Sequence, residues 1–207
     1  MRGVVRSRLY DRFIAGLTTR WYHAVLQRMP HGAYVLDVGI GTGAAVVRCA
    51  DLVRARDLRI TGLDIDRDYL AVCSAAVARA GLAAHVTPCL CSVYDHEGGP
   101  YDSVYFSASL MLLPDPVEAM RHVAKQLAPD GRIYFTQTFH HRRSGMVETV
   151  KPMLGRVTTI EFGRVTYEDE FRAAVDDAGL ELLELATLAE SRSASARLAV
   201  ARLPPPV

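Results

Sequence analysis

Short apolar runs and longer amphipathic segments alternate along most of the chain. Leu9 to Met29 carries apolar residues at helical spacing and stops at Pro30-His31-Gly32, which predicts an N-terminal helix. Further along, the runs of strand length predict strands at Tyr34–Val38, Arg59–Asp66, His85–Ser92, Ser103–Ser107 and Arg132–Thr136. The helical patterns between and after them predict helices at Ala44–Arg54, Tyr69–Ala80, Pro116–Leu127 and Tyr167–Ala178.

Strands that alternate with helices predict a parallel sheet with helices on both faces. The C-terminal part breaks the alternation, because the strand-like runs 180–188 and 193–203 are separated by only a short link. Two adjacent strands joined so briefly must be antiparallel. The expected fold class is therefore α/β, a Rossmann-like three-layer sandwich. Its seven-stranded, mostly parallel sheet ends in a C-terminal antiparallel hairpin.

Length and charge narrow the range of functions. The 207 residues, half of them hydrophobic, suit one globular domain, expected over 1–203 and followed by a short tail at 204–207. The 24 basic and 23 acidic residues leave a net charge of +1, which argues against a nucleic-acid partner held by phosphate charge. No apolar run reaches the roughly 18 residues of a membrane span.

The four cysteines give no sign of a metal site, because none forms a CxxC pair and no histidines stand at zinc spacing. We therefore expect no metal and a reducing, cytoplasmic location. The arginines within 1–12 leave a targeting presequence open as an alternative.

A glycine turn is the first feature that points to chemistry. The strand 34–38 runs into Gly39, Gly41 and Gly43, and a helical pattern follows. Such a turn lets the backbone approach a ligand, and the next helix directs its amides toward it. Asp64 ends the next strand roughly 20 residues later, the spacing expected for an acid that binds a ribose.

Two cofactors are compatible with a ribose-binding turn. Reading Gly39, Gly41 and Ala44 as a GxGxxA pattern suits a dinucleotide such as NAD. However, Asp37 stands two residues before Gly39, where a pyrophosphate would meet negative charge. A cofactor that bears an ammonium and a sulfonium is better matched.

An ordered set of motifs resembles the class I S-adenosylmethionine-dependent methyltransferases of the small-molecule, quinone-biosynthesis type. It consists of Val35-Leu36-Asp37-Val38-Gly39-Ile40-Gly41-Thr42-Gly43, Thr61-Gly62-Leu63-Asp64-Ile65, Tyr101-Asp102-Ser103-Val104-Tyr105-Phe106, Leu112-Leu113-Pro114-Asp115, Leu127-Ala128-Pro129-Asp130-Gly131-Arg132-Ile133 and Ala178-Gly179-Leu180. Tyr10-Asp11-Arg12-Phe13 is also similar to the N-terminal helix of the quinone-biosynthesis branch. The resemblance spans about residues 34–203.

The resemblance implies a role for each matching position. The methionine part of S-adenosylmethionine would face Asp37 and the amides around Gly39 and Gly41, and Gly43 would complete the turn. Asp64 would bind the ribose hydroxyls and Ile65 would pack on the adenine. The remaining contacts would be Ser92 and Val93 at the adenine edge, Ser107 near the methionine part and Tyr10 over its carboxylate. The product would be S-adenosylhomocysteine.

The acceptor is less well defined by the sequence. His140 and His141 follow the fifth strand and are candidates for a catalytic base, while solvated loop histidines are the alternative. Residues 140–165 form a long connection that we expect to act as a lid segment, with a helix packed on the sheet as the alternative. Residues 1–30 are expected to form an N-terminal helical cap.

The predicted function is transfer of a methyl group from S-adenosylmethionine to a small-molecule acceptor. One alternative is a catalytically inactive cofactor-binding protein or partner subunit, and another is an NAD-dependent oxidoreductase. Neither the acceptor atom nor a homodimer is decided by the sequence.

Overall fold

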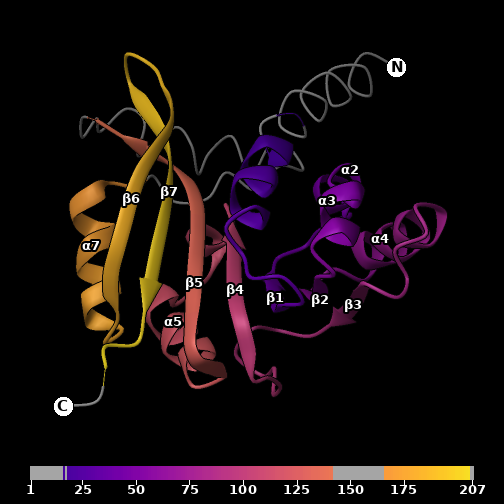
Figure 1. The fold of residues 1–207 in the computed structure, drawn as a ribbon. Coiled ribbons are helices and arrows are strands. Elements are labelled where there is room, and N and C mark those ends of the chain that lie inside the picture. Colours follow the sequence, from indigo (N-terminus) through magenta and orange to yellow (C-terminus); the bar gives the residue numbers. More distant parts are fainter. Residues whose placement is uncertain (1–15, 17, 142–165, 206–207) are drawn as a thin grey trace.

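A seven-stranded sheet forms the centre of the computed structural model, which describes residues 16, 18–141 and 166–205 (Figure 1). Its strands are β1 (Tyr34–Val38), β2 (Arg59–Asp64), β3 (Val86–Leu90), β4 (Tyr101–Ser107), β5 (Leu127–His140), β6 (Glu181–Glu190) and β7 (Ala194–Arg202). They lie in the order β3-β2-β1-β4-β5-β7-β6. All neighbouring pairs are parallel except those that β7 makes with β5 and β6, which are antiparallel. The predicted fold class is confirmed.

Helices cover both faces of this sheet, as the alternating pattern predicted. The helix over 18–26 packs on one face together with α2 (Ala44–Arg48), α3 (Ala50–Ala55) and α4 (Arg67–Arg79). On the other face lie α5 (Pro116–Ala124) and α7 (Glu168–Asp177) (Figure 1). Each face has its own buried apolar cluster, so the sheet is the middle of three layers.

Several element boundaries differ from the sequence prediction. The helix expected over 44–54 is interrupted at Cys49, which separates α2 from α3. The helix expected to reach Leu127 ends at Ala124, and Leu127 already pairs with Tyr101 of β4. β5 runs on to His140, because its last four residues pair antiparallel with β7. That extension depends on the hairpin partner and has no local sequence signal.

The carboxyl ends of β1, β2 and β4 meet at one edge of the sheet. Val38 is level with Leu63 of β2 and with Phe106 of β4. In an open α/β sheet this edge is where ligands bind, outside the ends of the parallel strands. Most of the expected lid segment, the first part of the cap and Tyr10 lie outside the described residues. No helix among residues 16, 18–141 and 166–205 is long and apolar enough to cross a membrane.

Candidate functional site

The glycine turn after β1 adopts a backbone that few other residues tolerate. Gly39, Gly41 and Gly43 all have positive φ, with Gly41 at 58°. A Cβ on Gly39 would come within 2.8 Å of the Cβ of Ser109, and one on Gly43 within 2.6 Å of the Sγ of Cys73. A Cβ on Gly41 would meet no atom of residues 16, 18–141 and 166–205 within 4 Å. The turn is therefore closed toward the protein at its two ends and open at Gly41.

Asp64 is bonded to this turn through its side chain. One carboxylate oxygen accepts a hydrogen bond from the Gly41 amide at 2.8 Å, and the other accepts from the Asp66 amide at 2.9 Å. The sequence pattern identified Asp64 as a ribose ligand but gave no sign of the bond to Gly41. Asp64 therefore fixes the open part of the turn and places negative charge beside it.

Asp37 lies under the turn and is almost completely buried, with 1% of its surface exposed. Its Oδ2 accepts a hydrogen bond of 2.7 Å from the hydroxyl of Tyr22, which belongs to the helix over 18–26. Its Oδ1 is also buried and has no hydrogen-bond partner among the described residues. A buried oxygen of this kind is costly unless it is protonated or meets a ligand.

The pKa of Asp37 is raised to about 7. Burial is the main cause, because it disfavours the charged form, and the negative charge of Asp64 adds to it. The Tyr22 hydrogen bond works in the opposite direction and stabilises the carboxylate. In the ligand-free protein the carboxyl therefore carries a proton below neutral pH.

This raised pKa predicts that the ligand-free protein loses stability as the pH rises. The folded state binds the proton more tightly than the unfolded state, so the contribution is present below about pH 4 and is lost as the pH reaches about 7. The loss amounts to at most about 4 kcal/mol in the free energy of unfolding. Asp37→Asn should remove this part of the pH dependence, as measured by urea unfolding between pH 5 and pH 8. If the free energy of unfolding depended on pH in the same way in both proteins, the raised pKa would not belong to Asp37.

The side of the site assigned to adenine is apolar and open. Ile65 follows β2 and is 78% exposed, and Leu90, at the end of the neighbouring β3, is about half exposed. Ser92 is half-buried and its hydroxyl accepts a hydrogen bond from the Tyr94 amide. The side chain of Val93 is buried in the core, so only the backbone of Val93 is left to contact a ligand.

Ser107 ends β4 level with Thr136 of β5, and its side chain is half-buried. The neighbouring Ser109 was not singled out by the sequence motifs. It packs against Gly39 and its hydroxyl donates a hydrogen bond to the carbonyl of Val38. No pattern in the sequence indicates this contact, because the two residues meet only when β4 pairs with β1.

The candidate bases His140 and His141 lie away from the glycine turn. β5 is separated from β1 by β4, and His141 lies five residues beyond the position level with Ser107, about 16 Å at strand spacing. The Nε2 of His141 is 2.9 Å from a carboxylate oxygen of Glu190. A carboxylate in this position orients the imidazole.

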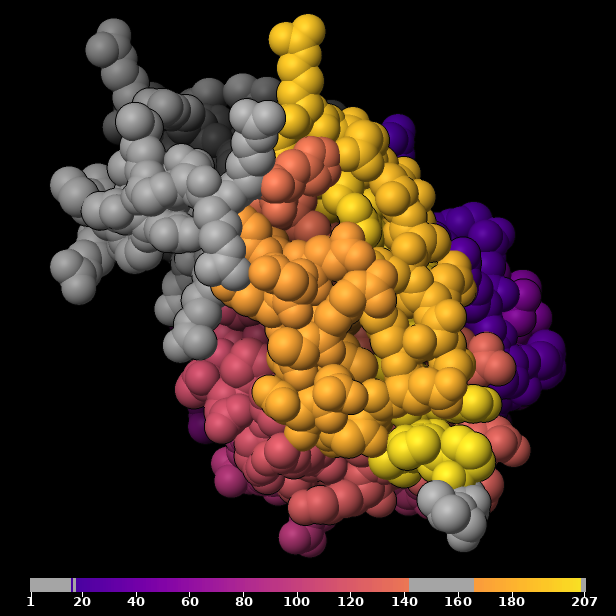
Figure 2. Space-filling model, turned by 90° about the vertical axis from the view of Figure 1, so that its left-hand side faces the viewer, coloured from indigo at the N-terminus to yellow at the C-terminus, as the bar shows by residue number. Residues whose placement is uncertain are grey.

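A pocket of about 580 Å³ lies at this end of β5. It is lined by Phe139, His140, His141, Tyr167, Glu168, Asp169, Arg172 and Arg197. In the space-filling view the end of β5 is seen between α7 and the β6–β7 hairpin (Figure 2). The pocket is large enough for a small organic molecule.

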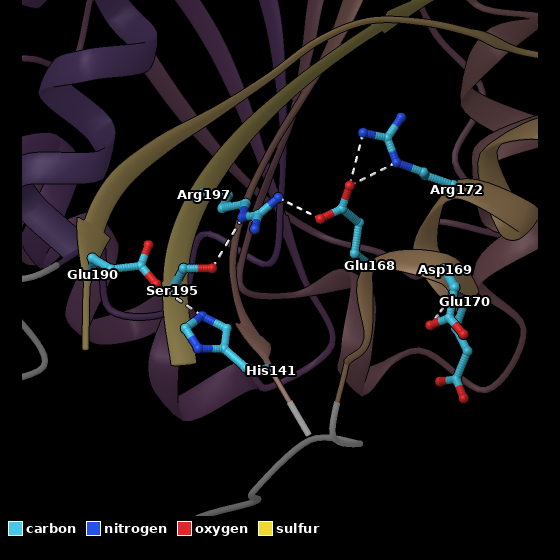
Figure 3. Close-up of polar contacts among 8 residues, drawn as sticks. All are labelled: His141, Glu168, Asp169, Glu170, Arg172, Glu190, Ser195 and Arg197. Atoms are coloured by element: carbon cyan, nitrogen blue, oxygen red, sulfur yellow. Dashed lines mark hydrogen bonds and ion pairs between the residues drawn. The ribbon is translucent and has the colours of Figure 1, made fainter. Parts of the chain in front are cut away.

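The walls of the pocket are connected by ion pairs (Figure 3). Glu168 bonds Arg172 at 2.8 Å and Arg197 at 2.5 Å. Arg197 also donates to the hydroxyl of Ser195 and stacks over the ring of Phe139 at 5.8 Å. The two arginines lower the pKa of Glu168, through the Arg172 hydrogen bond first. The guanidinium groups of Arg172 and Arg197 are thus both held in place by Glu168.

Comparisons with known proteins agree with the motif resemblance. Residues 35–131 match the family model described as a methyltransferase domain. The chain is 28% identical to the methyltransferase GfsG of Streptomyces halstedii over 77% of this chain and 56% of that protein. It is 32% identical to a ubiquinone biosynthesis O-methyltransferase of Sodalis glossinidius, over 51% of this chain and 41% of the relative. The chain thus spans about half the length of these curated relatives.

Solved structures agree with the fold. The structure of the [4+2]-cyclase SpnF has a TM-score of 0.74 at 18% identity and is matched over 90% of this chain and 81% of its own. The family match and the sequence relatives confirm the resemblance to class I methyltransferases of the small-molecule branch.

Proposed function

We propose that the chain transfers a methyl group from S-adenosylmethionine to a small-molecule acceptor. The observation that carries the proposal is the buried Asp37, one oxygen of which has no hydrogen-bond partner among the described residues, beneath an open glycine turn. A positively charged group would satisfy that oxygen, whereas the phosphates of a dinucleotide would be repelled by it. The match to a methyltransferase domain supports the same choice.

Each part of the site then has a task in holding the cofactor. When bound, S-adenosylmethionine supplies a methyl group already activated on its sulfonium. Asp37 and the amides at Gly39 and Gly41 would hold the methionine part. Asp64 would accept from the ribose hydroxyls. The contacts that complete the site would be Gly43 in the turn, Ile65 on the adenine face, Ser92 and Val93 at its edge, and Ser107 and Tyr10 toward the methionine part.

The acceptor is proposed to be a small molecule with a hydroxyl group. The name of the Sodalis relative, an O-methyltransferase, supports an oxygen acceptor. A neutral hydroxyl must lose its proton during transfer, for which histidine is the usual base. His140 and His141 line the pocket at the end of β5, and His141 is oriented by Glu190. They remain our candidates for the base.

The first experiment compares ligands by calorimetry. At pH 8, where Asp37 is ionised, we expect S-adenosylmethionine and S-adenosylhomocysteine to bind and NAD to show no heat of binding, because the Asp37 carboxylate disfavours a pyrophosphate. Tight NAD binding would favour the alternative of an NAD-dependent oxidoreductase.

The second experiment measures S-adenosylhomocysteine formation with a panel of phenols and enols. Binding without turnover across that panel would favour the alternative of a cofactor-binding protein or partner subunit.

A substitution at the adenine side tests the orientation of the cofactor. Ile65→Ser should weaken S-adenosylhomocysteine binding about fivefold, because the ligand loses roughly 1 kcal/mol of apolar contact. The free energy of unfolding should change by less than about 0.5 kcal/mol, since Ile65 is 78% exposed. Leu183→Ser is the matched control, because Leu183 is 39% exposed on β6 at the far end of the strand order. Equal affinities of the two variants would place the adenine elsewhere.

A further inference from the structure

Tyr22 connects the N-terminal helix to the candidate cofactor site. Its hydroxyl lies 2.7 Å from Oδ2 of Asp37, and 3% of the residue is exposed. Its ring packs edge-to-face on Tyr105 of β4, with ring centroids 5.0 Å apart. No sequence motif assigned a role to Tyr22. The Tyr22–Asp37 bond joins residues from different layers, since Asp37 is on β1 and Tyr22 is on the helix that covers it.

The hydrogen bond from Tyr22 makes the two carboxyl oxygens of Asp37 different from each other. Oδ2 is taken by Tyr22, whereas Oδ1 is buried and without a hydrogen-bond partner in the described part of the chain. If Tyr22 were absent, the carboxyl group could rotate and either oxygen could face the ligand. The bond therefore fixes which oxygen is presented and limits its orientation.

We propose that Tyr22 is a positioning residue for the cofactor: it holds Oδ2 of Asp37 so that Oδ1 receives the ammonium group, and the Asp37 carboxyl releases a proton to solvent when that group binds. This inference rests on the proposed function, because it requires a cofactor with a cationic end.

Asp37 is the group at this site whose pKa lies near neutral pH. Tyr22, Tyr105 of β4 and Cys73 of α4 face it and have raised pKa values, that of Cys73 reaching about 11. Asp64 of β2 adds negative charge. With the pKa of Asp37 at about 7, about nine tenths of the ligand-free protein carries the proton at pH 6. An arriving ammonium favours the ionised form, so the proton leaves.

Proton release is measured by titrating S-adenosylhomocysteine into the protein at pH 6, in two buffers that differ in their heat of ionisation. This ligand has the ammonium group, which is fully protonated at pH 6. We expect close to one proton to be released per molecule bound. Adenosine has no ammonium and should bind without proton release. Asp37→Asn should bind S-adenosylhomocysteine without proton release.

Tyr22→Phe tests the positioning role. Without the hydroxyl the Asp37 carboxylate is harder to form, so affinity for S-adenosylhomocysteine should fall about tenfold relative to the unmodified protein at pH 7. The ratio should be roughly twice as large at pH 6, where more of the Asp37 carboxyl is protonated and the ammonium of the ligand is still fully charged. A merely structural role would give the same ratio at both pH values. Affinity for adenosine should be unchanged.

Tyr105→Phe is the matched control. It also removes a buried phenol hydroxyl, but one that bonds the hydroxyl of Thr136 and not Asp37. It should keep both the affinity at pH 7 and the proton release, and thermal unfolding should show that both variants are folded.

The outcomes separate the inference from the proposed function. If the unmodified protein does not bind S-adenosylhomocysteine, the proposed function is wrong and this inference with it. If the protein binds the ligand but releases no proton at pH 6, or if Tyr22→Phe loses affinity equally at both pH values, only the inference is overturned.

Discussion

Replacing Gly41 with valine should abolish cofactor binding, lowering affinity for S-adenosylhomocysteine by at least about 100-fold. Gly41 has a φ of 58°, and a Cβ there points into space that no atom of the described residues occupies within 4 Å. A branched side chain would fill the space that the ligand requires and would resist this backbone conformation. The amide of Gly41 would also shift away from Asp64, which it now bonds at 2.8 Å. Calorimetry on the folded variant measures the effect.

The effect of backbone strain in Gly41→Val has to be separated from the effect of filling the space that the ligand requires. Gly32 is the matched position, because its φ is 75° and a Cβ there also meets no atom within 4 Å in the part of the chain that the structure describes. It lies before β1, at the opposite end of that strand from Gly41. Gly32→Val should destabilise the protein to a similar degree and leave the affinity unchanged. Loss of binding in both variants would mean that strain in β1, not occupation of a ligand site, explains the Gly41 result.

The second large effect is expected at Asp64. Asp64→Ala should weaken S-adenosylhomocysteine binding by roughly 10- to 100-fold, because it removes charge-assisted hydrogen bonds to the ribose worth about 1.5–3 kcal/mol. The structure adds a second consequence. The substitution also frees the amides of Gly41 and Asp66, so the free energy of unfolding should fall by about 1 kcal/mol. Urea unfolding and calorimetry of the same variant measure the two effects.

Asp66 supplies the control for charge at this position. It lies two residues further on, where its side chain caps α4 by accepting from the amides of Asp68 and Tyr69. Asp66→Asn removes one negative charge but keeps a capping oxygen. It should bind S-adenosylhomocysteine within about twofold of the unmodified protein. An equal loss of affinity in this variant would show that general electrostatics, not a ribose contact, accounts for the Asp64 effect.

The sequence by itself determined the order and type of most elements and the place of the turn. Apolar runs of strand length can be identified locally, and so can Gly39, Gly41 and Gly43, because a turn with positive φ at each position excludes most other residues. The reversed C-terminal hairpin also followed from local information, since a short link between two strands leaves no room for a crossover. The acid Asp64 was found by its spacing from the turn.

Only the tertiary structure decided how these residues work together. The bonds of Tyr22 to Asp37 and of Gly41 to Asp64 join residues 15 and 23 positions apart, and no local pattern encodes them. The same holds for the final residues of β5, which become a strand only because β7 pairs with them. This extension places His141 beside Glu190 and away from the glycine turn. Burial of Asp37 is likewise a property of the packed layers. Its raised pKa arises because the sheet and the covering helix exclude water from a residue that the sequence shows only as an acid.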